Sequence, residues 1–126
     1  MVWVIRIVVV LMGGLFLMMG LNFLINPIDA AAGFFVTPDG PAGFSNIRGD
    51  VAGMFLGLGT FCLIGLKPGA QYWLHAAAVL LGWIALGRLF GFVLDGTPDS
   101  AVIAFVAELV FILLLIIAAQ RLKVSA

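Results

Sequence analysis

The sequence predicts an all-α integral membrane protein, folded as an up-down-up-down bundle of four membrane-spanning helices. Of the 126 residues, 64% are hydrophobic and only 10% are charged. Soluble domains usually contain about 45–50% apolar residues and about 25% charged residues. The mean hydropathy is +1.28, and a soluble chain this short could not bury so much apolar surface. The apolar residues fall into four runs, each near the ~20 residues that a helix needs to cross a bilayer.

The first predicted span covers about residues 7–25 and carries no charge. It ends at Asn26-Pro27, because a proline disfavours helical geometry in the residue before it. An alternative interpretation is a secretory signal, with Arg6 in its basic region and residues 30–32 as the cleavage site. The apolar run is longer than a usual signal core, which favours a retained span.

The connection 27–45 is the only long one between the predicted spans, and it contains three prolines. Its apolar trio, residues 34–36, predicts a lid-like loop that lies on the membrane surface or over the mouth of the bundle. The second span then covers about residues 46–66. Its Gly49, Gly53 and Gly57 form a stripe of small residues, and Gly87 and Gly91 form another on the third span. Small residues at this spacing let helices approach closely, within the monomer or with a protein partner or second copy.

The third span covers about residues 72–94 and the fourth about 101–119. A short turn at 67–69 and a longer one at 95–100 join the last three spans, so neighbouring helices must be antiparallel. Arg88 lies seven residues before Asp95, and Glu108 lies seven residues after Ala101. At 1.5 Å per residue, each charge lies roughly 10 Å below the same end of its helix. An unpaired charge near the bilayer centre costs at least ~2.5–3.5 kcal/mol, so we predict an Arg88–Glu108 salt bridge.

Other polar residues are expected at the same end of the bundle. The predicted cluster contains one or more residues from every span: Asn22, Asn26, Arg48, Asp50, Arg88, Asp95 and Glu108. Three interpretations are open for it. The charge pairs can fix helix register only, the cluster can bind a lipid headgroup or small acidic ligand, or it can form a proton or solute pathway.

The distribution of Lys and Arg predicts the orientation. Four basic residues flank the end shared by the termini and the 67–71 turn, and two lie on the opposite side: Arg6, Lys67, Arg121 and Lys123 against Arg48 and Arg88. The positive-inside rule therefore places both termini in the cytoplasm.

No catalytic constellation is evident in the sequence. The hydroxyl residues have no histidine at matching depth, since His75 is expected at the opposite side, and no phosphate-binding loop is present. The lone His75 and the lone Cys62 predict no metal site and no cofactor, and a net charge of zero gives no argument for nucleic-acid binding. A raised pKa at a buried Glu108 would make it a possible general base, but its expected arginine partner acts in the opposite direction.

Several short motifs resemble the DUF4345 family, small bacterial four-span proteins of unknown function. They are Asn26-Pro27, Arg48-Gly49 through Gly53, Gly87-Arg88, residues 95–98 and Glu108. The resemblance covers nearly the whole chain and implies a four-span fold and a polar cluster. It implies no agreed activity. For the chain itself we expect a location in the bacterial cytoplasmic (inner) membrane.

Two functional hypotheses follow. The first is a non-enzymatic accessory, assembly or stabilising subunit of a larger membrane complex, because the chain is small and has no soluble domain. The second is the binding or transport of a lipid or small polar ligand in the polar pocket. A membrane enzyme ranks third, since its only proton-transfer groups are expected to be paired.

Overall fold

The computed structural model describes residues 1–125, and every regular element within them is a helix. Four helices are long and apolar enough to cross a membrane, which confirms the predicted fold class. In chain order the elements are α1 (Val2–Ile25), α2 (Pro27–Ala32), α3 (Gly40–Asn46), η1 (Ile47–Val51), α4 (Ala52–Ile64), α5 (Tyr72–Leu94) and α6 (Asp99–Val124).

The second span begins earlier than the sequence predicted. It starts at Gly40 as α3, passes through the π-helical turn η1 and continues as α4. Pro41 falls within the predicted loop 27–45, but it lies in the first turn of α3, where proline's missing N–H costs no helical hydrogen bond. The connection 27–45 is therefore not one loop, because it contains α2 and most of α3.

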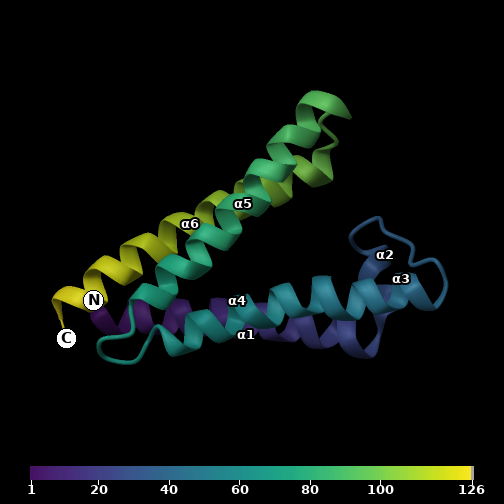
Figure 1. Cartoon of the computed structure of the whole chain (residues 1–126). Helices are drawn as coiled ribbons and strands as arrows, with labels where there is room; N and C mark the ends of the chain where they lie inside the picture. Colours follow the sequence, from purple (N-terminus) through teal and green to yellow (C-terminus); the bar gives the residue numbers. More distant parts are fainter. Residues whose placement is uncertain (126) are drawn as a thin grey trace.

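The four long helices are arranged as two hairpins (Figure 1). Helix α1 packs along α4, and α5 packs along α6, whereas contacts between the two pairs are sparse. The pairs meet near the chain termini and diverge toward the opposite side of the molecule. We call these sides the terminal end, which also holds the turn at 65–71, and the loop end, which holds residues 26–46 and 95–98. The bundle is thus closed at its terminal end and open at its loop end.

Glycines set the close approach of α1 to α4. A Cβ atom added at Gly59 would lie 2.6 Å from Leu17 Cγ and 2.8 Å from the carbonyl oxygen of Gly13. Both distances are too short for a real contact, so the helices can be this close only without a side chain there.

The glycine stripe singled out in the sequence is not part of that contact. A Cβ added at Gly49, Gly53 or Gly57 would meet no atom within 4 Å, and the same holds for Gly87. Of the alternatives open for this stripe, packing within the monomer is therefore wrong. The residues lie on a face of the second span that no other helix of residues 1–125 covers.

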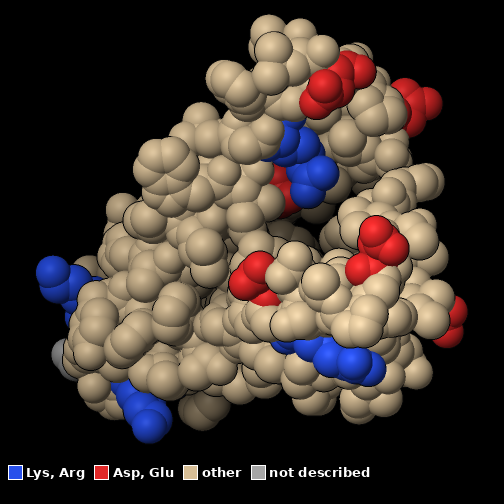
Figure 2. All heavy atoms as spheres, turned by 45° about the vertical axis from the view of Figure 1, so that its right-hand side comes forward, with Lys and Arg blue, Asp and Glu red and all other residues tan. Residues whose placement is uncertain are grey.

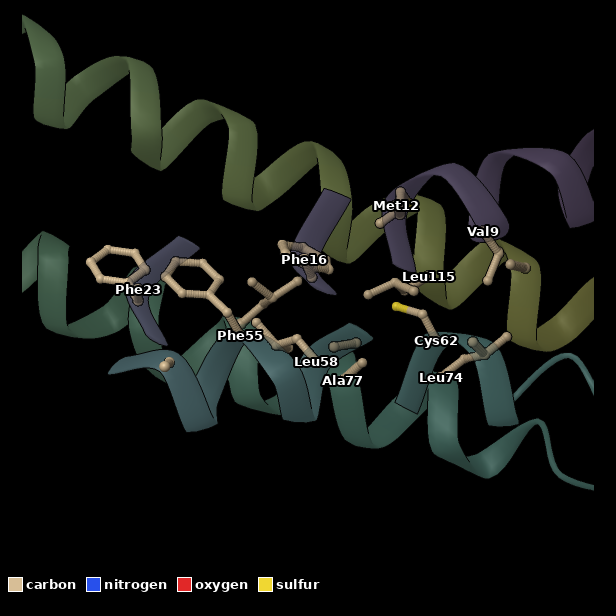
Figure 3. Packing of buried hydrophobic residues seen from close by; sticks show 14 of the residues in the cluster. Val9, Met12, Phe16, Phe23, Phe55, Leu58, Cys62, Leu74, Ala77 and Leu115 are labelled. Carbon is tan, nitrogen blue, oxygen red and sulfur yellow. The ribbon is translucent and has the colours of Figure 1, made fainter. Parts of the chain in front are cut away.

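The apolar core runs along the α1–α4 hairpin, from Ala30 and Ile47 to the terminal end, and all four long helices contribute to it (Figure 3). Phe16 of α1 is central, with its ring centroid 6.5 Å from that of Phe55 and 5.5 Å from that of Phe111. Leu58, Leu74 and other core side chains are fully buried. In a bilayer such contacts stabilise through dispersion and close packing, because lipid tails are as apolar as the core.

Candidate functional site between the two hairpins

Arg88 and Glu108 form a salt bridge across the α5–α6 hairpin, as the sequence predicted. Arg88 Nη2 lies 2.7 Å from Glu108 Oε1, and Arg88 Nε donates to Oε1 at 3.1 Å and to Oε2 at 3.2 Å. The planar guanidinium thus meets the carboxylate with two nitrogens, which is the geometry that makes arginine–carboxylate pairs strong.

The pair is largely shielded but not closed off. The exposed fractions of the two side chains are 28% for Arg88 and 11% for Glu108. Glu108 accepts all three hydrogen bonds, while Arg88 Nη1 donates to no atom within residues 1–125. A charged pair with one unused donor nitrogen therefore lies between the helices.

A cavity of about 290 Å³ adjoins this ion pair, and we call it the inter-hairpin cavity. All four long helices contribute to its walls, so the cavity lies between the two hairpins. Twelve of its fourteen lining residues are apolar: Phe16, Met19, Phe34, Val51, Met54, Phe55, Leu58, Leu81, Ile84, Ala104, Ala107 and Phe111. The other two are Arg88 and Glu108. The walls of the cavity are therefore apolar except at a single polar spot, the Arg88–Glu108 ion pair.

Phe34 reaches this cavity from the segment that follows α2. Its ring lies 5.2 Å from the ring of Phe23 and 5.8 Å from that of Phe55, measured between centroids. The next residue, Phe35, is 83% exposed and has a positive φ of 58°, a backbone region that costs non-glycine residues about 1–3 kcal/mol. The tight turn is held by the Val36 N–H, which donates to the Ala31 carbonyl at 2.9 Å. Of the apolar trio 34–36, only Phe34 lines the cavity.

Three of the predicted cluster residues lie at the loop end of the α1–α4 hairpin. Asn26 Nδ2 is 3.4 Å from Asn22 Oδ1, and Arg48 Nε donates to the Leu24 carbonyl at 3.0 Å. Asn26 and Arg48 line a second cavity, which contains neither Arg88 nor Glu108. The structure thus divides the expected single pocket into two, because the hairpins separate toward the loop end.

The last two cluster residues, Asp50 and Asp95, are exposed. Within residues 1–125 neither side chain makes a hydrogen bond or ion pair. Acidic and basic side chains lie around the hollow between the two hairpins (Figure 2). In the described part of the chain, no group of three or more His, Cys, Asp or Glu residues could hold a metal ion.

Sequence reasoning missed two features. The first is the apolar wall of the cavity, since Met19 and Met54 show no pattern that separates cavity walls from lipid-facing surface. The second is Arg6, whose Nη1 donates to the Leu66 carbonyl at 3.1 Å. Leu66 lies in the turn after α4, so this bond ties the beginning of α1 to that turn, and only the fold shows that the two are near.

Four membrane-length helices with a charge pair and an apolar cavity define a small multi-pass membrane protein. A family model described as "Domain of unknown function (DUF4345)" matches residues 4–119, so the chain belongs to the DUF4345 family. Searches of curated proteins and of solved structures gave no significant match.

Proposed function

We propose that this membrane protein binds a lipid-like molecule in the inter-hairpin cavity. The observation that carries the proposal is the combination of twelve apolar wall residues with one ion pair whose arginine keeps an unused donor. Ligand sites are typically apolar with a few convergent polar groups, and this cavity has that composition. At about 290 Å³ the cavity lies just below the usual range of about 300–1,000 Å³, so it suits a ligand with one slender apolar chain or ring.

The charge state of the site favours a neutral polar group on the ligand. Arg88 and Glu108 together carry no net charge, and Glu108 Oε1 lies 2.7 Å from Arg88 Nη2. An anionic ligand at Arg88 would therefore be repelled by the nearby carboxylate in a medium of low dielectric constant. A carbonyl or hydroxyl oxygen can accept from Nη1 without that penalty. We therefore expect a ligand with an apolar chain or ring and a neutral oxygen at one end.

The test compares ligands and variants by thermal unfolding in detergent micelles. A long-chain alcohol should stabilise the native protein, by about 2.7 kcal/mol at 100 times its Kd, and a fatty acid of equal length should stabilise it less. Ala107→Phe fills the cavity and should abolish the effect. Val106→Phe is the matched control, because Val106 is the preceding residue and is exposed. Equal responses from the two variants would contradict the proposal.

A second candidate is the accessory or assembly subunit of a membrane complex. It is favoured by the glycine stripe, since Gly53 and Gly57 face open space on the second span and could receive a helix of a partner or of a second copy. Gly53→Leu and Gly57→Leu should then dissociate a stoichiometric complex extracted from native membranes. Gly14→Leu is the control, because Gly14 also faces open space but lies on α1. A complex unaffected by all three changes would count against this function.

We propose no enzymatic activity for either candidate. We also propose a bacterial inner-membrane location with both termini in the cytoplasm. The support for this orientation is the concentration of Arg6, Lys67, Arg121 and Lys123 at the terminal end.

A further inference from the structure

A second cavity, of about 440 Å³, lies at the loop end of the α1–α4 hairpin, and we call it the Arg48 cavity. It is formed where α1 ends, α2 begins and α3 passes into η1. Its polar walls are Asn26, Asp29 and Arg48. Because it lies at the end of a membrane-length helix, it is expected at the depth of lipid headgroups rather than of acyl chains.

The side chain of Arg48 is oriented by two contacts. Its Nε donates to the Leu24 carbonyl at 3.0 Å, and its guanidinium carbon lies 5.8 Å from the centroid of the Phe44 ring. Within residues 1–125, its two terminal nitrogens donate to no atom and no carboxylate oxygen lies within 4.0 Å of them. A guanidinium that is fixed at Nε and free at both Nη atoms presents the fork that binds phosphate oxygens.

Asp29 places a negative charge on the wall of the same cavity. Its carboxylate forms no salt bridge with Arg48, so two opposite charges line one open space without neutralising each other directly. Such a site complements a molecule that carries both an anionic and a cationic group. A purely anionic headgroup would be attracted by the Arg48 guanidinium but repelled by the Asp29 carboxylate.

The exposed apolar residues at the rim indicate that the molecule is a lipid. Ile25 is 70% exposed and Ile28 is 61% exposed, and both line the Arg48 cavity. These side chains can contact the glycerol and first acyl carbons of a phospholipid, whereas a soluble zwitterion would leave them uncovered.

We propose that the Arg48 cavity binds a phospholipid with a phosphoethanolamine headgroup. The phosphate accepts hydrogen bonds from the Arg48 Nη atoms, and the ammonium group donates to the Asp29 carboxylate. Phosphocholine fits less well, because its quaternary ammonium has no N–H to donate. This inference is independent of the ligand proposed for the inter-hairpin cavity, since Arg48 and Asp29 do not line that cavity.

The experiment is native mass spectrometry of the full chain, released from micelles that contain phosphatidylethanolamine, phosphatidylglycerol and phosphatidylcholine in equal amounts and with identical acyl chains. The native protein should retain phosphatidylethanolamine about tenfold better than either competitor, the factor expected for one charge-assisted hydrogen bond. Equal retention of the three lipids would overturn the proposal.

Two variants separate the roles of the charges. Arg48→Gln should lose the retained lipid, and Asp29→Asn should keep a lipid but prefer phosphatidylglycerol, because the repulsion of the anion is gone. Arg121→Gln and Asp39→Asn are matched controls at exposed positions outside the cavity and should behave like the native protein. Circular dichroism checks the fold of each variant. If Asp29→Asn keeps the native lipid preference, the assignment is wrong even if Arg48→Gln fails to fold.

A competition arm distinguishes the two sources of this headgroup. Soluble phosphoethanolamine, added at the same concentration as the lipids, should leave the bound phospholipid in place, because it cannot cover the Ile25 and Ile28 side chains. Displacement of the lipid under these conditions would overturn a phospholipid as the occupant.

Discussion

The Arg88–Glu108 salt bridge gives the sharpest quantitative prediction about this protein. Removing one partner of a shielded pair leaves the other charge without its counter-ion, which typically costs about 3–5 kcal/mol for a fully buried pair. Because the Arg88 side chain keeps 28% of its exposure and Glu108 keeps 11%, we expect Arg88→Leu and Glu108→Leu each to cost about 2–4 kcal/mol. The double substitution leaves no unpaired charge, so it should cost less than the sum of the single ones.

The assay is a double-mutant cycle of unfolding in detergent micelles, in which far-UV circular dichroism measures the loss of helix. The coupling free energy between the two substitutions should be at least about 2 kcal/mol, in the direction of recovery. Arg121→Leu is the control for loss of a charge alone. Arg121 is exposed near the end of α6, and its substitution should change stability by less than about 0.5 kcal/mol.

Additive costs in the double variant would refute the reasoning. They would mean that each charge interacts with lipid headgroups, detergent or water rather than with its neighbour across the hairpin. The inter-hairpin cavity would then have no neutral ion pair at its polar spot, and the expected preference for a neutral ligand oxygen would lose its basis.

Two further predictions concern helix packing and orientation. Gly59→Ala should destabilise the protein by about 1–3 kcal/mol, because the new methyl group would lie 2.8 Å from the Gly13 carbonyl oxygen. Gly57→Ala, which meets no atom within 4 Å, should be neutral or stabilising by up to about 1 kcal/mol; equal losses of stability in thermal unfolding would contradict the packing argument. For orientation, a cysteine placed at Thr97 should react with a membrane-impermeant maleimide in intact cells, and one placed at Ser125 only after permeabilisation. The native Cys62 is fully buried and should give no background, and the reverse labelling pattern would invert the proposed topology.

The ion pair shows how much of the site could be predicted from sequence. Arg88 and Glu108 lie equally far from the turn that joins their helices, and an antiparallel hairpin brings such positions together whatever the rest of the fold does. The cost of an unpaired charge in the bilayer adds a strong reason for the contact. The equal distance of the two residues from the turn and the cost of an unpaired charge were together enough to predict the contact. The structure confirms the pair at 2.7 Å.

The expected single pocket shows the limit of the same reasoning. Matching depth places Arg48 and Arg88 at the same end of the molecule, but depth says nothing about lateral distance. The two arginines lie in different hairpins, and these diverge toward that end (Figure 1). Sequence patterns also failed to identify the packed glycines. Gly57 and Gly59 are chemically identical, and only the position of Leu17 and Gly13 on α1 distinguishes them.

By itself, the sequence determined that the chain is helical, that four of its segments are long and apolar enough to cross a membrane, and that Arg88 and Glu108 pair. These properties depend on local composition and on distance along a helix, both of which are one-dimensional. Only the tertiary structure decided which helix faces pack and where they separate. That choice depends on side-chain fit between helices that are distant in sequence, and it turned one expected polar pocket into the inter-hairpin cavity and the Arg48 cavity.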